Sequence, residues 1–172
     1  PTVMFAAQEK YVNEGLPKSF GLALILIGAS FFVLFKSVKY GLLALIPSVV
    51  PIIMAGGVAT LIGLDFDLGT LIVGAMTMGI AVDDAIHVVS RYVTARRRGL
   101  STDNAVREAM NEAGRAVIFT SIILVIGFGT MLFASLTPFI NIGLFTAVIM
   151  GLALIGDLIV LPALLYIFDN NE

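Results

Sequence analysis

The sequence predicts an all-α integral membrane protein with five transmembrane helices. Of its 172 residues, 59% are hydrophobic and only 13% are charged, whereas a soluble domain carries about a quarter charged residues. The mean hydropathy is +1.04, and the apolar residues gather in five long runs. Runs of this kind are typical of helices that cross about 30 Å of hydrocarbon.

The first two apolar segments cover residues 19–35 and 40–63. The first has about 17 residues, which is near the lower limit for a membrane span. Pro47 and Pro51 lie inside the second segment. Because proline removes backbone hydrogen bonds, we expect a kink there and neighbouring helices that satisfy the freed groups.

The third segment, residues 68–90, carries two adjacent acids, Asp83 and Asp84, within its apolar run. Placing a carboxylate in hydrocarbon costs about 3 kcal/mol or more, so intramembrane acids are usually functional. Every fourth residue along one face reads Ala75, Gly79, Asp83, His87 and Arg91. Small residues let a second helix approach closely. We therefore expect Asp83 to face a packed helix interface. Asp84 should lie to one side, about 100° around the helix, toward a neighbouring helix or a water path.

The acid pair is a candidate proton site. Burial and a like charge nearby both favour the neutral carboxyl, so we expect Asp83 or Asp84 to hold a proton at neutral pH. His87 can contact either acid and titrates near neutrality, which suits proton exchange with the cytoplasm. A hydrogen-bonded structural role for His87 is the alternative.

The only sizeable polar connection, residues 91–115, separates the third segment from the fourth, residues 119–136. Ser101 or Thr102 can cap a short helix that extends to Gly114. We expect this helix to be a solvated connector at the membrane surface.

The fifth segment, residues 140–168, contains a third intramembrane acid, Asp157, which shares one face with Thr146, Met150 and Ala153. Asp157 is either a second proton-relay acid or a polar group that bonds a neighbouring helix, and the residues leave both readings open. Gly143 and Gly151 lie on a stripe of small residues that favours close helix packing.

The lysines and arginines predict the orientation. With five spans, eight of the ten fall on one side of the membrane. We expect that side, with the connector and the C-terminus, to be cytoplasmic and the N-terminus to be extracytoplasmic. Residues 1–18 are polar and mixed in charge, which is typical of the end of a water-exposed region.

Composition also excludes several classes of function. Cysteine is absent and there is one histidine, so neither thiol chemistry nor a dedicated metal site is expected. No nucleophile–base pair stands out, and the sequence predicts neither an enzyme nor a cofactor.

Three motifs stand out along the chain: GIAVDDAIHVVSRY before an arginine cluster, GRAVIFTS at 114–121, and DLIVLPALL at 157–165. Together they resemble the RND superfamily, closest to its MMPL-like branch of hydrophobe exporters, which includes patched-like proteins. Each half of such a transporter has one helix, a large extracytoplasmic porter domain and five further helices. The resemblance thus implies the end of a porter region at 1–18, the five-helix domain at 19–168 with its connector at 91–115, and a cytoplasmic tail at 169–172. It favours the C-terminal half.

The resemblance also implies a function. Family members export lipids, hydrophobic compounds or drugs, and the bacterial ones are driven by proton influx across the inner membrane. The relay acids then fall on Asp83 and Asp84. The implied partners are protons, a lipid-like substrate, membrane lipids, and the other transporter half or a second copy, with no nucleic acid. In well-known drug exporters a lysine of the opposite half pairs with the acids. No Lys or Arg lies within a span core here, so the counter-charge lies elsewhere or is replaced by His87 or water.

Two other functions fit a five-helix unit of this kind. A sterol-sensing domain binds lipid and regulates without pumping, and a Sec-accessory subunit assists protein export. The acid pair favours a proton path over a passive sensor.

Overall fold

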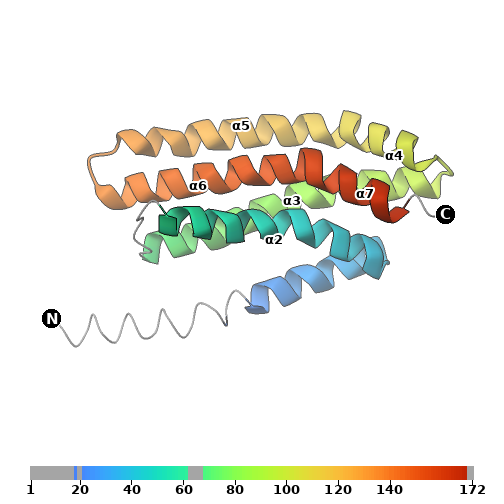
Figure 1. Ribbon diagram of the computed structural model, residues 1–172, viewed down its shortest axis with the longest axis horizontal. Helices are drawn as coiled ribbons and strands as arrows, with labels where there is room; N and C mark the ends of the chain where they lie inside the picture. Colours follow the sequence, from blue (N-terminus) through green and yellow to red (C-terminus); the bar gives the residue numbers. More distant parts are fainter. Residues whose placement is uncertain (1–17, 19–20, 62–67, 170–172) are drawn as a thin grey trace.

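The computed structural model describes residues 18, 21–61 and 68–169, and its helices lie side by side along a common long axis (Figure 1). Four helical runs are long and apolar enough to cross a membrane, and a shorter apolar helix, Gly21–Phe35 (the first helix), precedes them. The predicted all-α membrane fold is confirmed. Of the expected N-terminal region at 1–18, the structure describes only Lys18, and the expected tail beyond Asp169 lies outside the described residues.

The second span, α2 (Val38–Leu61), continues as one helix across Pro47 and Pro51. Proline has no N–H, so the carbonyls of Leu43 and Pro47, four residues earlier in each case, have no α-helical donor. The α2 helix packs against two neighbouring helices, α3 and α6.

The third span, α3 (Leu68–Arg97), is longer than predicted. The sequence prediction ended this helix at residue 90, but it extends through Arg96 and Arg97. Positive charges in the last turn stabilise a helix by interacting with its dipole. One face of α3 is buried along its length, at Thr77, Ala81, Asp84, Val88 and Tyr92.

The fourth span belongs to a run from Thr102 to Phe133. It consists of α4 (Thr102–Ala109), the π-helix η1 (Met110–Gly114), α5 (Arg115–Gly129) and the 3₁₀-helix η2 (Thr130–Phe133). Ser101 caps α4 as predicted and accepts from the N–H of Asn104. Two expectations were wrong. The helix does not end at Gly114, and α4 is not simply solvated, because Ala105 and Val106 are buried where it packs on α3 and α7.

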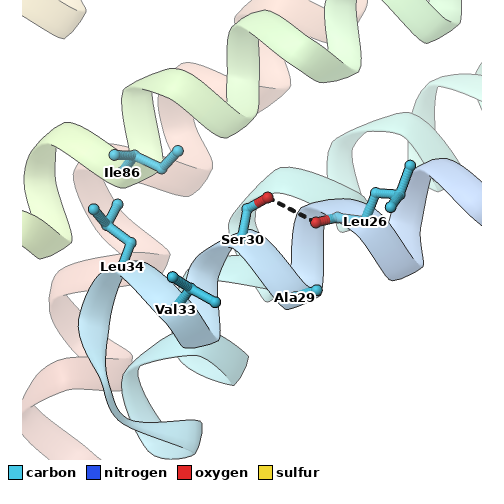
Figure 2. Close-up of a pocket in the computed structure, with 6 residues that line it drawn as sticks. All are labelled: Leu26, Ala29, Ser30, Val33, Leu34 and Ile86. Atoms are coloured by element: carbon cyan, nitrogen blue, oxygen red, sulfur yellow. Dashed lines mark hydrogen bonds between the residues drawn. The ribbon is translucent and has the colours of Figure 1, made fainter.

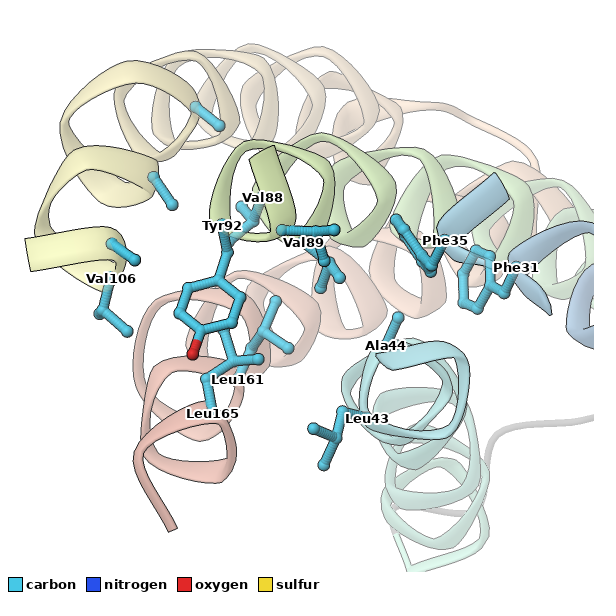
Figure 3. Close-up of a cluster of buried hydrophobic side chains, with 14 of the residues drawn as sticks. Phe31, Phe35, Leu43, Ala44, Val88, Val89, Tyr92, Val106, Leu161 and Leu165 are labelled. Atoms are coloured by element: carbon cyan, nitrogen blue, oxygen red, sulfur yellow. The ribbon is translucent and has the colours of Figure 1, made fainter. Parts of the chain in front are cut away.

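The last span combines α6 (Thr137–Ile155), the π-helix η3 (Gly156–Val160) and α7 (Leu161–Asp169). Its C-terminal part joins the main buried cluster, where Leu161 and Leu165 lie beside Tyr92 of α3 (Figure 3). Phe31 and Phe35 of the first helix belong to the same cluster. The cluster also includes Val93 and Ala95 of α3. It thereby positions the end of the molecule at which Arg96, Arg97 and Arg98 lie, the arginine-rich end.

Candidate functional site

The two adjacent acids of α3 face opposite environments. Asp84 is buried, with 8% of its surface exposed, whereas the Asp83 side chain is 70% exposed. The prediction that Asp83 is packed was therefore wrong within this chain, whereas Asp84 is turned toward neighbouring helices, as expected. The apolar face of α3 packs against the other helices, and Asp84 lies on that face.

Asp83 belongs to an exposed stripe, made up of Ala75, Gly79, Asp83, His87 and Arg91. His87 Nε2 lies 3.7 Å from Asp83 Oδ1, and its side chain is 66% exposed. A side chain at Gly79 would meet no atom within 4 Å, and the same holds for Gly151. Gly143 differs, because a Cβ there would lie 2.6 Å from the Phe128 carbonyl oxygen. It marks a close approach of α6 to α5.

Asp157 is the most deeply buried acid of the membrane-spanning segments in the described chain. Only 1% of its surface is exposed, and neither carboxylate oxygen accepts a hydrogen bond from a described residue. It lies in the π-helix η3, and single π-turns within α-helices are frequently found at functional sites. The face of α6 that leads to Asp157 is also buried, because Thr146 and Met150 on that face have no exposed surface.

Helix packing brings Asp84 and Asp157 together. Ala81 of α3 packs with Met150 and Ala153 of α6, and about one turn further along each helix stand Asp84 and Asp157. In keeping with this, α3 also contacts η3, the turn that carries Asp157.

The acid pair lies deep within the spans. Further along the same two helices, Arg96 of α3 meets Asp169 of α7, so the helices run in parallel. Twelve residues separate Asp84 from Arg96, and twelve separate Asp157 from Asp169. At 1.5 Å per residue this is about 18 Å. With Arg96 and Asp169 at the membrane surface, the pair lies near the middle of a hydrocarbon layer about 30 Å thick.

A backbone acceptor from α2 lies close to η3. A Cβ built on Gly156 would lie 3.3 Å from the Pro47 carbonyl oxygen. Because residue 51 is a proline, this carbonyl has no α-helical donor. The prolines of α2 thus present a polar oxygen beside the residue that precedes Asp157.

A third buried acid, Asp169, was missed by the sequence analysis, which assigned it to the tail at 169–172. Its carboxylate is 2% exposed and accepts from Lys39 Nζ at 2.7 Å, Arg96 Nε at 2.9 Å, Tyr40 Oη at 3.1 Å and the Tyr92 hydroxyl. Thr102 Oγ1 donates to its backbone carbonyl at 3.2 Å. This Asp169 cluster ties α2, α3, α4 and α7 together at the arginine-rich end. The signal in the sequence was an acid placed directly after the last apolar run.

Within the described ranges, no group of three or more His, Asp or Glu side chains is arranged to hold a metal ion. The buried acids instead lie at two separate places, Asp84 and Asp157 within the spans and Asp169 at the helix ends.

Comparison with known proteins identifies the family. The model of the MMPL family matches residues 1–170. The chain belongs to the MMPL family. The resemblance seen in the three sequence motifs is thereby confirmed, and the chain is a multi-pass membrane protein.

Relatives of this MMPL chain are membrane and transport proteins. A membrane protein of Methanocaldococcus jannaschii is 31% identical over 151 residues, which cover 88% of this chain and 38% of that protein. The trehalose monomycolate exporter MmpL3 of Mycolicibacterium smegmatis is 29% identical over 99 residues, covering 56% of this chain and 10% of the exporter. The protein translocase subunit SecDF of Brucella abortus is 27% identical over 157 residues, covering 83% and 21%. The chain thus matches less than half the length of each relative.

Proposed function

We propose that this MMPL chain is the transmembrane part of one half of a proton-coupled exporter of hydrophobic or lipid-like substrates. Asp84 and Asp157 are the pair that binds the coupling proton. The observation that supports this proposal is the Asp157 carboxylate, buried at mid-span without a hydrogen-bond partner in the described chain and beside a second buried acid.

The environment of Asp157 links its charge to the packing of the helices. An ionised carboxylate without a partner is very costly in a low-dielectric interior, whereas a neutral carboxyl is tolerated. Two neighbouring acids titrate as a coupled pair. Proton binding at the pair therefore stabilises the packed arrangement seen here, and proton release favours one in which water or a cation reaches the acids.

Asp83 and His87 are proposed to connect the buried pair with water. They lie one turn apart on the exposed stripe of α3, and Arg91 continues that stripe toward the arginine-rich end. The small residues Ala75 and Gly79 leave room on this stripe for a helix of the other transporter half or of a second copy.

The arginine-rich end is proposed to face the cytoplasm, because positively charged loops are retained there. The polar region at 1–18 is then extracytoplasmic and continuous with a porter region. A single cysteine introduced at Asn104→Cys, an exposed position of α4, should be labelled only from the cytoplasmic side, and labelling from outside would reverse this orientation.

A second candidate is an accessory subunit of protein export, since the match to SecDF covers most of the chain. In both candidate functions the buried acid pair of this chain would bind the coupling proton, so they differ in cargo and not in this site.

The test is transport by the full-length protein in liposomes, with an imposed proton gradient, a fluorescent lipid cargo and an internal pH dye. Asp157→Asn should reduce both proton flux and export at least tenfold. Its thermal stability should be unchanged or higher, because the amide is neutral. Asp103→Asn, an exposed acid of α4, should transport normally.

Three results distinguish the alternatives. Proton flux without lipid movement would favour the protein-export function. Lipid binding without proton flux in the unmodified protein would favour a sterol-sensing-like regulator. Full proton-driven export by the double variant Asp84→Asn, Asp157→Asn would show that the pair is structural.

A further inference from the structure

A polar pocket of about 320 Å³ opens at the arginine-rich end, where the first helix meets α2 and α3. Its polar lining comes from Lys36, Ser37, Tyr40, Arg96 and Arg97, and Phe35 and Val93 form its apolar floor. Three of the five polar side chains are cations, so the pocket has the chemistry of an anion site.

Two of these cations have no acidic partner in the part of the chain that the structure describes. Arg96 is engaged by Asp169, but no ion pair is formed there by Lys36 or Arg97. Arg97 Nη2 donates to the Phe35 carbonyl at 3.1 Å, which fixes the guanidinium between the first helix and α3. Two uncompensated charges beside one pocket favour an anionic ligand.

The backbone at Lys36 is unusual. Its φ is +52°, and its N–H donates to the Phe32 carbonyl at 3.0 Å, as in a left-handed cap at the end of a helix. Glycine is the residue that usually occupies this position, because a side chain is strained there. The chain therefore has a lysine at a place where local geometry alone favours glycine.

The N-terminus of α2 adds to the positive potential. The helix begins at Val38, directly after Ser37, and its first N–H groups have no partner within the helix. Free N–H groups and the helix dipole stabilise an anion such as a phosphate group.

An apolar groove lies between the first helix and α3, further from the arginine-rich end. Figure 2 shows its lining, with Leu26, Ala29, Val33 and Leu34 on the first helix opposite Ile86 of α3. The groove measures about 490 Å³, and its one polar side chain, Ser30, donates to the Leu26 carbonyl at 2.8 Å. On α3, Ile86 of the groove and Val93 of the pocket are seven residues, or two turns, apart on one face. The groove thus leads toward the cationic pocket.

We infer that an anionic phospholipid binds here, with its phosphate in the pocket and one acyl chain along the groove. Basic pockets between helices at a membrane surface are suited to acidic headgroups, and the groove supplies a surface for the chain. This lipid is a bound ligand of the first helix and α3, and its site does not involve the buried acid pair.

The test uses the full-length protein in detergent, titrated with dioleoyl phosphatidylglycerol while thermal unfolding is followed. Phosphatidylglycerol should raise the unfolding temperature more than phosphatidylcholine, and sodium phosphate should not reproduce the effect. Each charge removed from the pocket should weaken lipid binding about fivefold. Lys36→Gly combined with Arg97→Gln should then weaken it about 25-fold.

Two comparisons separate binding from folding. Lys36→Gly should be at least as stable as the unmodified protein without lipid, because glycine relieves the backbone strain at this position. Arg115→Gln removes an exposed charge outside the pocket and should change lipid binding less than twofold.

Three outcomes would overturn the inference. Equal stabilisation by phosphatidylcholine would mean that the headgroup charge is not recognised. Equal stabilisation by sodium phosphate would mean a site for free anions. An equal loss of binding in Arg115→Gln would mean attraction by diffuse surface charge.

Discussion

Replacing Asp169 by asparagine should destabilise the protein more than any exposed ion-pair variant. The substitution keeps the shape of the side chain but removes its negative charge. Two cations, Lys39 and Arg96, and two tyrosine hydroxyls then surround a neutral amide, which has fewer acceptor positions than a carboxylate. The four helices joined by the Asp169 cluster lose their common partner.

The size of the effect follows from the exposure of each partner. Arg96, with a side chain 23% exposed at 2.9 Å, contributes about 1.5 kcal/mol as a charge-assisted hydrogen bond. Lys39 is 38% exposed, so solvent screening reduces its contribution to about 0.5 kcal/mol. The Tyr92 hydroxyl belongs to a fully buried residue, and weakening its bond costs about 1 kcal/mol. The expected loss is about 3 kcal/mol.

Thermal unfolding of the purified protein measures this loss. For a domain of this length, about 3 kcal/mol corresponds to a fall of about 6–12 °C in the unfolding temperature. Glu112→Gln is the matched control, because it removes an exposed carboxylate that lies 3.1 Å from Arg91. Exposed pairs contribute about 0–1 kcal/mol, so the control should shift by no more than a few degrees. Equal shifts in both variants would refute the reasoning from burial.

Two further predictions concern glycines. Gly143→Ala should destabilise the protein by about 1–3 kcal/mol, since the new Cβ would lie 2.7 Å from Met131 Cβ. A Cβ at Gly151 meets nothing within 4 Å, so Gly151→Ala should be neutral or slightly stabilising. Thermal unfolding compares the two variants. Gly79→Leu should leave the stability of this chain unchanged but weaken its association with another half or copy, as measured by crosslinking, and unaltered crosslinking would exclude the exposed stripe as an interface.

The sequence was sufficient to predict the helices, because each depends on a long local run of apolar residues. It was less reliable at their ends. The end of α3 was placed at residue 90, since the arginines that follow are polar. Arg96 and Arg97 instead lie in the last turn of α3, where positive charge interacts favourably with the helix dipole. The continuous run from α4 to α5 was likewise hidden by the polar residues between them.

The two acids of α3 show why the site was harder to predict. The small residues Ala75 and Gly79 suggested that the face of Asp83 is packed. In this chain the packed face is the one with the larger apolar residues Met78 and Val88, and Asp84 lies there. A stripe of small residues indicates where a helix can approach, but it does not say which helix does so.

The Asp169 cluster depends on contacts that no local pattern contains. Asp169 bonds Lys39, 130 residues earlier, and Arg96, 73 residues earlier. Only the packing of α2 and α3 against α7 brings these side chains to one point. The burial of Asp157 likewise depends on the packing of η3 against α2 and α3. It could not be predicted from the sequence of the last apolar segment alone.

The π-turn at η3 holds one more residue than an ordinary α-helical turn, and it lies between two ends of the last span that are fixed by packing. At one end, Asp169 is tied by its hydrogen bonds; at the other, the Gly143 turn fits closely against α5. If the π-turn relaxed into an ordinary α-turn, residues on its two sides would shift by about 1.5 Å and rotate by about 100° relative to each other. Because both ends are held by packing, they resist this shift and rotation, which retains the π-turn around Asp157. The last span is therefore held at both ends, and its one π-turn is the place that contains the buried Asp157.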